Sequence, residues 1–257
     1  MKIVLIIALV AVVLPYIAGP LLLWVNGSRI PPTKLEQADP EATLTQTAEA
    51  HFWKTTHFFA SNGFEKLGGR VRESNQSQLA GYKQIWRHGD TGEVALVGAF
   101  VKADDPEYGN AFVAFMHERG NGAMVSTTNF DAGARTLFNP PGASKLTIKT
   151  QDVAALRELH KSHVRMLGGG ARPFRVRDGF ALCNQLDNTT RTIALSKKHF
   201  RAEGDSLRIT LWGAVAAIWV NLPPLKGRYE QQDRDLLDRV MAAQATSGAH
   251  ASSARAA

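Results

Sequence analysis

The sequence predicts an α+β protein with an N-terminal transmembrane helix and an antiparallel sheet of about four or five strands packed with helices on one side. Three observations carry this prediction. Residues 3–25 contain no charged side chain, residues 81–150 alternate short apolar runs with Gly, Asn and Asp turns, and residues 152–167 repeat apolar side chains at helical spacing. We therefore expect an anchor, a sheet and covering helices.

Composition limits the classes of protein that fit. The 257 residues are 44% hydrophobic and 21% charged, which is typical of a globular chain with room for one substantial domain plus appendages. The net charge is +7, yet no basic run is longer than Lys197-Lys198. We expect a basic surface near anionic lipid rather than a nucleic-acid partner. The single cysteine, Cys183, excludes an internal disulfide framework and a thiolate zinc cage.

The opening segment from Ile3 to Val25 is long enough for a membrane anchor. As a helix it spans about 35 Å, against a hydrocarbon core of about 30 Å. Lys2 supplies a positive flank and Trp24 lies where an interfacial aromatic is expected. Basic residues on the two flanks are nearly balanced, so the side of the membrane that holds the soluble domain stays undetermined.

A cleaved signal peptide and a soluble core helix are the alternatives for this segment. If the segment is a signal peptide, its cleavage site lies near Ala18 or Gly19. However, Pro20 follows such a cut directly, and the apolar run continues through Leu21–Val25. These features favour an uncleaved signal anchor in the cell membrane, with a bacterial inner membrane as the expected location.

Composition shifts divide the rest of the chain. We expect the transmembrane anchor over 1–26, a linker over 27–40, the α+β domain over 41–206, a second apolar helix over 207–225, and a surface helix with a disordered tail over 226–257. The domain is expected to open with a helix that starts at Asp39-Pro40-Glu41 and stops at Asn62-Gly63.

Two hairpins form the expected sheet, one from 81–88 and 93–102 and the other from 111–119 and 123–130. Residues 144–150 add a fifth strand, and a helix is expected from Asp152 to Leu167. Residues 173–183 and 190–200 alternate less cleanly, so strands and short helices both stay open there.

The second apolar segment runs from Ile209 to Leu225, with Arg208 and Lys226 on its flanks. Its 17 residues lie at the lower limit for a membrane span. A second span and a helix that lies in the interface or caps the domain are both consistent with this pattern.

Parts of the chain resemble a loose group of uncharacterised, membrane-anchored bacterial proteins. The likeness rests on "VSTTNF" (125–130), "FNPPG" (138–142), "DVAALRELHKSHV" (152–164) and "LRITLWGAVAAIWVNLPP" (207–224). The group has no established activity, so the resemblance implies a membrane anchor and a bacterial origin and transfers no function.

His160 and His163 are the candidate metal ligands. Both lie on the apolar face of the expected helix, three residues apart, a spacing that helical metal sites use. His117 or His88 is a candidate third ligand, and Glu158 lies nearby in sequence. The alternative is that both imidazoles pack at the rim of the core. No other cofactor is expected.

Other polar groups carry weaker signals. Residues 126–129, Ser-Thr-Thr-Asn, either hold a polar ligand or satisfy backbone groups at a strand end. No G-x-S-x-G motif supports a Ser/His/Asp hydrolase. The glycine groups at 120–122 and 168–170 fit a hairpin turn and a helix stop, not a phosphate cradle.

Eight aromatic residues are expected to build the core between helix and sheet, with a lipid pocket in that layer as an alternative. They are Phe52, Trp53, Phe58, Phe59, Trp86, Phe100, Phe112 and Phe115. The leading expectation for function is a membrane-anchored, non-enzymatic interaction or accessory domain, with membrane lipid and another membrane protein as partners. The alternatives are a lipid or apolar-ligand binding domain and a metal-dependent hydrolase that uses His160 and His163.

Overall fold

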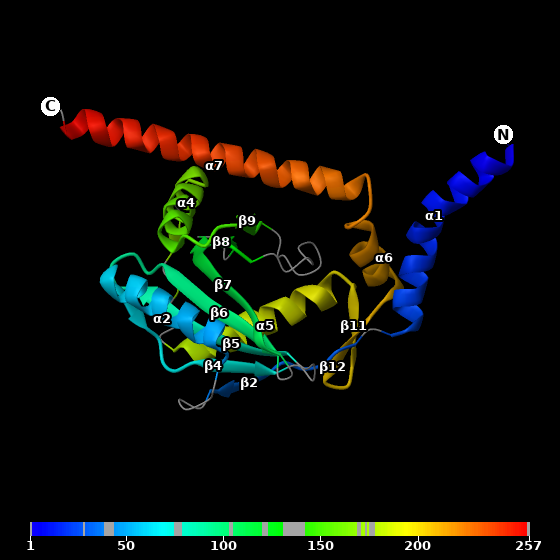
Figure 1. The fold of residues 1–257 in the computed structure, drawn as a ribbon, viewed down its shortest axis with the longest axis horizontal. Helices are drawn as coiled ribbons and strands as arrows, with labels where there is room; N and C mark the ends of the chain where they lie inside the picture. The colour runs from blue at the N-terminus through cyan, green and yellow to red at the C-terminus, as the bar shows by residue number, and fades with distance from the viewer. Residues whose placement is uncertain are drawn as a thin grey trace. The chain divides into compact units, whose positions relative to one another are not determined.

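The chain folds as an α+β protein in two compact units, as the computed structural model in Figure 1 shows. The structure describes residues 2–27, 29–38, 44–74, 79–102, 105–119, 123–130, 142–168, 171–172, 174 and 178–255. Among these, unit 1 comprises the residues up to Pro32 and those of Asp187–Gln232. Unit 2 comprises those of Thr33–Asp131, Pro140–Leu186 and Asp233–Ala257.

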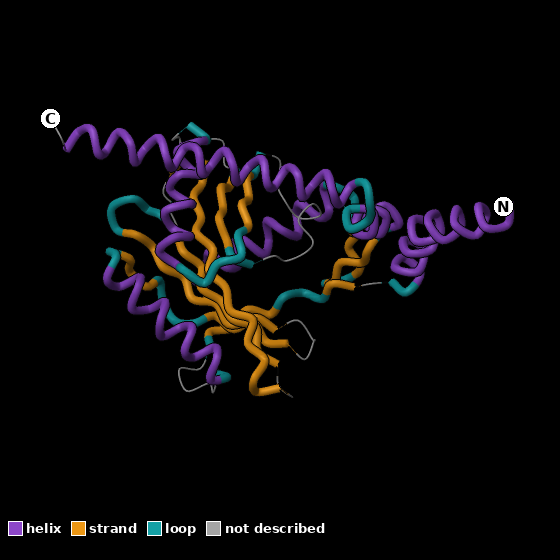
Figure 2. The backbone as a smooth tube through the Cα atoms, turned by 45° about the horizontal axis from the view of Figure 1, so that its top comes forward, coloured by secondary structure: helices purple, strands orange, loops and turns teal. Residues whose placement is uncertain are grey.

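Unit 2 is built on a nine-stranded sheet with the order β2-β4-β5-β6-β7-β8-β9, in which β3 also pairs with β5 and β10 with β7. The strands are β2 (Lys34–Gln37), β3 (Phe64–Lys66), β4 (Val71–Ser74), β5 (Leu79–His88), β6 (Val94–Lys102), β7 (Asp105–Arg119), β8 (Met124–Thr128), β9 (Ser144–Thr147) and β10 (Ala171–Arg172). Figure 2 shows how strongly the long strands twist. Both expected hairpins are confirmed.

The sheet differs from the prediction in size and direction. Four or five antiparallel strands were expected, and the additional strands are two to four residues long, too short to give a periodic pattern. The expected fifth strand is β9, but it pairs with β8 in parallel, placing Ser144 beside Val125. Hairpin signals cannot predict such a pairing, because tight turns join antiparallel strands only.

Helices cover both faces of the sheet of unit 2, rather than the one face expected (Figure 1). On one face α2 (Gln46–Ser61) and α4 (Val153–Met166) pack their buried Phe52, Phe59 and Leu156 against β5, β6 and β7. On the other face the first half of α5 (Gly179–Ser196) packs Leu182 and Cys183 against the same strands. The sheet is therefore buried on both sides.

Unit 1 contains α1 (Lys2–Val25), α6 (Leu211–Trp219) and a three-stranded sheet with the order β1-β12-β11. The strands are β1 (Arg29–Ile30), β11 (Phe200–Glu203) and β12 (Ser206–Ile209). Its small core contains Ala194, Phe200, Leu207, Ile209 and Ala214.

Helices α1 and α6 pack directly on each other at Gly19 and Pro20. A Cβ atom added at Gly19 would lie 3.2 Å from Cγ2 of Ile218, so the missing side chain lets α6 approach. Pro20 has no N–H, which leaves the carbonyl of Tyr16 without its usual helical donor. The indole Nε1–H of Trp219 donates to that carbonyl at 2.8 Å.

Several boundaries differ from the sequence prediction. The expected linker forms β1 and β2, which pair with β12 and β4. Residues 179–183 and 190–196 of the segments 173–183 and 190–200 belong to the single helix α5, which ends before β11 begins at Phe200. Helix α7 (Leu225–Arg255) extends through the segment expected to be disordered.

The first helix of the expected domain has a different described start. Thr45 caps α2 by accepting a hydrogen bond from the backbone of Ala48, whereas Asp39-Pro40-Glu41 lies outside the described residues. Its expected end is confirmed, with Asn62 as the C-cap and Gly63 at φ 76°.

The second apolar segment forms a shorter helix than its sequence predicts. Residues 206–209 belong to β12, so α6 is limited to nine residues. A search of the part of the chain that the structure describes finds no helix that combines the length and the hydropathy needed to cross a membrane.

Replacing Gly179 with alanine is expected to destabilise unit 2 by about 1–3 kcal/mol, because the new Cβ overpacks the start of α5. That Cβ would lie 2.3 Å from the backbone carbonyl oxygen of Leu67 and close to Ile85, and neither can move away cheaply. Urea unfolding measures the loss. Gly69→Ala is the control, because nothing lies within 4 Å of its Cβ position; equal losses in both variants contradict this account.

Candidate functional site: a buried chain of hydroxyl and imidazole groups

Helix α4 places the candidate site against the sheet of unit 2. Asp152 begins the helix by accepting hydrogen bonds from the backbone N–H groups of Ala154 and Ala155. Leu156 then anchors one face in the core. On the same face Arg157, His160 and His163 are buried, so α4 brings three basic side chains into the interior.

Five side chains from four elements form one continuous hydrogen-bonded chain. His117 Nδ1 lies 2.9 Å from His160 Nε2, and His160 Nδ1 lies 3.0 Å from Thr127 Oγ1. Thr127 Oγ1 lies 3.1 Å from His163 Nδ1, whose Nε2 lies 2.8 Å from Ser144 Oγ. Thr127, His160 and His163 are inaccessible to solvent, whereas Ser144 is partly exposed. The chain therefore runs from a fully buried interior to a partly open serine.

All four hydrogen bonds can form at once when the three histidines are neutral, because a neutral imidazole has one donor and one acceptor nitrogen. The protons then point along the chain in one direction or in the other. In one arrangement Ser144 donates to His163, which donates to Thr127, and so on to His117. In the reverse arrangement His163 Nε2–H donates to Ser144.

Burial keeps these imidazoles neutral. Loss of hydration lowers the pKa of His117 to about 4 and the pKa of His163 to about 4. Burial also places the pKa of His160 well below its usual value, and the neighbouring His117, His163 and Arg157 lower it further. At neutral pH each ring therefore has a lone pair available to accept a hydrogen bond.

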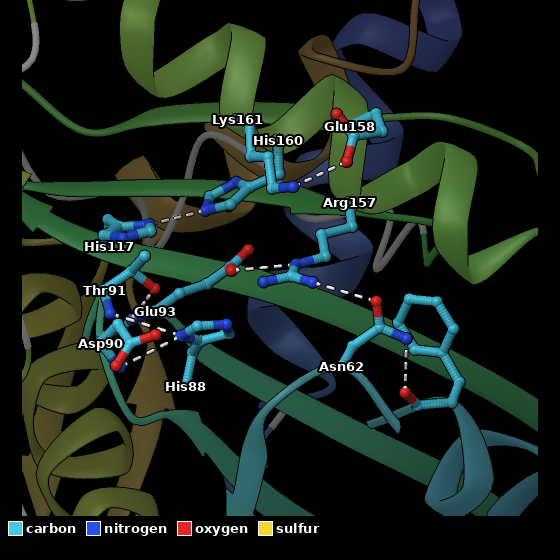
Figure 3. Close-up of polar contacts among 11 residues, drawn as sticks. Asn62, His88, Asp90, Thr91, Glu93, His117, Arg157, Glu158, His160 and Lys161 are labelled. Carbon is cyan, nitrogen blue, oxygen red and sulfur yellow. Dashed lines mark hydrogen bonds and ion pairs between the residues drawn. The ribbon is translucent and has the colours of Figure 1, made fainter. Parts of the chain in front are cut away.

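A buried ion pair lies next to this chain, as Figure 3 shows. Arg157 Nε donates to Glu93 Oε2 at 3.1 Å, and the guanidinium carbon lies 4.6 Å from the centroid of the Phe64 ring. Arg157 Nη1 also donates to Asn62 Oδ1 at 3.4 Å. Burial raises the pKa of Glu93 while the charge of Arg157 opposes that rise. The other carboxyl oxygen, Oε1, is buried and accepts no hydrogen bond from the described residues.

The structure brings His160 and His163 together with one of the two suggested third residues. His117 contacts His160, whereas His88 accepts hydrogen bonds from the backbone N–H groups of Asp90 and Thr91 in a separate turn (Figure 3). Glu158 points to Lys161 at the surface instead. The alternative of packing in the core is nearer to what is found, although the rings bond to side chains rather than backbone.

A metal centre finds little support in this geometry. No group of three or more His, Cys, Asp or Glu side chains within the described residues is arranged to hold a metal ion. The four ring nitrogens of His160 and His163 are directed at Thr127, Ser144 and His117. A metal ion would displace these hydrogen bonds.

Two residues of the segment 126–129 fill one of the two expected roles, that of satisfying backbone groups. Thr128 donates to the carbonyl of Val113, and Asn129 bridges the backbone of Val113 and Thr150. These two residues therefore satisfy backbone groups at the strand end. Thr127 differs, because its hydroxyl joins His160 to His163. Ser144 was not predicted, since its partner lies on another element and no local motif surrounds it.

The aromatic core is largely confirmed. The ring of Phe59 packs on the rings of Trp86 and Phe115 on the α2 face of the sheet. Phe100 and Phe112 stack on the opposite face. Trp53 is a correction, because it lies on the outer face of α2 and is 69% exposed.

The glycine predictions are partly testable. Gly168 has φ 89° directly after α4, which confirms a helix stop there. The turn at 120–122 and the residues 169–170 lie outside the described residues.

Comparison of the chain with models of known protein families, with curated proteins and with solved structures finds no match. The site is therefore interpreted from its own geometry.

Acidification below about pH 6.5 is expected to destabilise unit 2. The folded-state pKa values of His117 and His163, about 4, lie below the unfolded value of 6.5. Between these limits the unfolded chain binds more protons, so stability is full above about pH 6.5 and declines as the pH falls to about 4. Urea unfolding at four pH values from 7.5 to 4 measures the slope. His163→Gln should reduce it, and His57→Gln, on the exposed face of α2, should not.

Replacing Arg157 with methionine is expected to cost about 3–5 kcal/mol, because Glu93 is left buried without its partner. The double variant Glu93→Leu/Arg157→Met should recover much of that loss in the free energy of unfolding. Lys161→Met, which breaks the exposed pair with Glu158 on the same helix, is the matched control and should cost less than about 1 kcal/mol. Losses of the same size at the two sites contradict the assignment.

Proposed function

We propose that the protein is membrane-anchored, with unit 1 bound to the lipid bilayer and unit 2 as the domain it holds there. The observation that carries the proposal is α1, a 24-residue helix whose residues 3–25 include no charged side chain. A straight helix of this length measures about 36 Å, against a hydrocarbon core of about 30 Å, so the uncharged sequence and its length support the anchor although no described helix meets the combined criteria for a span. The cell membrane, and specifically a bacterial inner membrane, is the proposed location.

Exposed apolar side chains in unit 1 support this proposal. Large hydrophobic residues face outward along the second half of α1 and on α6, where water would solvate them poorly and lipid would solvate them well. They are Val13, Leu14, Ile17, Leu21, Leu22, Trp24 and Val25 on α1, and Leu211, Trp212 and Trp219 on α6.

The contact at Pro20 also suits a lipid environment. In hydrocarbon an unpaired backbone carbonyl costs several kcal/mol, since no water is present to pair with it. Trp219 supplies the donor that Pro20 lacks, and Gly19 provides the small residue that close helix packing in membranes favours.

Helix α6 is proposed to pack beside α1 rather than to form a second span. Its nine residues give a length of about 14 Å, roughly half of the hydrocarbon thickness. This supports the interfacial alternative for the segment Ile209 to Leu225, with Trp212 in the headgroup region where tryptophan is enriched.

For unit 2 we propose an interaction or accessory role towards another membrane protein. Trp53 projects from α2 with 69% of its surface exposed and packs edge-to-face on His57, their centroids 4.4 Å apart. Tryptophan is the residue type most enriched at binding hot spots. A lipid pocket in the aromatic layer has less support, because the ring of Phe59 contacts the rings of Trp86 and Phe115 there.

The anchor is tested by fractionating cells that express the full chain. We expect the unmodified protein to stay in the pellet after an alkaline carbonate wash, because α1 is held by hydrocarbon rather than by charge. Ile17→Lys/Leu21→Lys places two lysines on the exposed side of α1, and a lysine costs about 2.5–3.5 kcal/mol at the helix centre and less towards its end. This variant should shift to the supernatant.

Ile17→Leu/Leu21→Ile is the matched control and should fractionate like the unmodified chain. Uncut, full-length protein that remains in the supernatant after ultracentrifugation without detergent would refute the anchor.

A further inference from the structure

We propose that unit 2 also contains a catalytic centre in which Ser144 is the nucleophile, His163 is its general base and Thr127 is a positioning residue. The substrate class is an ester or thioester of a carboxylic acid. This inference goes beyond the tethering role proposed above and does not depend on where unit 1 is bound.

The geometry meets the requirements for an activated hydroxyl nucleophile. Ser144 Oγ and His163 Nε2 are 2.8 Å apart, within the range over which an imidazole accepts a proton from an attacking serine. The other ring nitrogen, Nδ1, is held 3.1 Å from the Thr127 hydroxyl. A nucleophile, a base and a third group that orients the base thus follow one another, as in serine hydrolases on unrelated folds.

The proposed nucleophile, Ser144, is more accessible to solvent than His163 and Thr127. His163 and Thr127 are fully buried, whereas Ser144 is partly exposed at the first position of β9. Gly142, with φ 77°, turns the chain two residues before it. The proposal therefore places the substrate at the partly exposed serine, with the buried base behind it.

The reaction balances with water as the only co-substrate. Ser144 Oγ attacks the carbonyl carbon, and its proton passes to His163 Nε2. The bond from this carbon to the leaving oxygen or sulfur then breaks, and the leaving group takes the proton from His163. Water attacks the acyl-Ser144 intermediate, gives a proton to His163, and releases the acid as that proton returns to Ser144.

The third group limits the substrate class. Thr127 contributes a neutral hydroxyl at the position where serine proteases have a carboxylate, so the imidazolium formed during attack receives less electrostatic stabilisation. The pKa of His163, about 4, means that the imidazole is unprotonated at neutral pH but has a low affinity for the proton it must accept. Esters and thioesters with good leaving groups need less proton transfer than amides, and therefore suit this centre.

His160 and His117 give the chain its direction. The productive arrangement requires His163 Nδ1–H to donate to Thr127, which must then donate its own proton to His160 Nδ1. In the tautomer with its proton on Nε2, His160 accepts at Nδ1 and donates to His117 Nδ1, 2.9 Å away. These two histidines act through Thr127 and are positioning residues.

The test uses the full chain in detergent micelles with two probes. Hydrolysis of p-nitrophenyl butyrate gives the rate, and a fluorophosphonate, which loses fluoride to a nucleophilic serine, identifies the residue by peptide mass spectrometry. We expect labelling at Ser144 and loss of hydrolysis in Ser144→Ala. His163→Gln should lower the rate by about 10²–10⁴-fold, the usual contribution of a general base.

Thr127 is tested by a conservative pair. Thr127→Val removes the hydroxyl at nearly constant shape and should slow hydrolysis at least about tenfold, whereas Thr127→Ser should restore much of the rate. Ser126→Ala, on the same strand but outside the chain, is the control and should hydrolyse the ester normally.

Several outcomes would overturn the proposal. One is unmodified protein that shows a cooperative unfolding transition but hydrolyses the ester no faster than buffer. Another is fluorophosphonate labelling that persists in Ser144→Ala. Equal rates in Thr127→Val and Thr127→Ser, both folded, would remove the positioning role. Because Ser144 is partly exposed, Ser144→Ala is expected to fold, so the first two outcomes can be read even if other variants unfold.

Discussion

The polar groups that α4 buries against the sheet must find their partners inside the protein, and the arrangement of unit 2 depends on this requirement. A buried imidazole or guanidinium without a partner costs more than most single contacts contribute. Arg157 meets the requirement through Glu93, and His160 and His163 meet it through Thr127. Any shift of α4 along the sheet breaks several of these bonds together, so they define the position of the helix more sharply than Leu156 does alone.

Local patterns predicted the parts of unit 2 that depend on neighbouring residues. The two hairpins and α4 follow from turn residues, alternation and the Asp152 cap, all of which lie within a few positions. The metal hypothesis singled out His160 and His163, and in the structure their ring nitrogens lie within hydrogen-bond distance of hydroxyl and imidazole groups. Periodicity placed both rings inward, but only the fold shows that a threonine hydroxyl lies between them.

What the sequence could not predict depends on distant pairings. Ser144 meets His163 because β9 lies parallel to β8, and no local signal specifies a parallel pair. For the second half of α5, the sequence left strand and helix open for a related reason. The apolar residues of this helix pack against different neighbours along its length, so they give no single periodic pattern. Trp53 was placed in the core because it shares a helix with Phe52 and Phe59, although at 100° per residue it lies on another face.

In both units, polar groups that water cannot reach form hydrogen bonds with side chains that lie far away in the sequence. In unit 1 the proline that breaks the hydrogen bonding of α1 is compensated by an indole some two hundred residues later. In unit 2 two histidines share one hydroxyl, which leaves a single bond at the open end of the chain, between His163 and Ser144. Ser144 satisfies the buried Nε2 of His163, and it differs from Thr127 in being partly exposed. The serine at that position, 2.8 Å from a ring nitrogen whose counterpart is bonded to Thr127, fits the structural requirement of His163 and also the proposed catalytic role, because it is the partly exposed member of the pair.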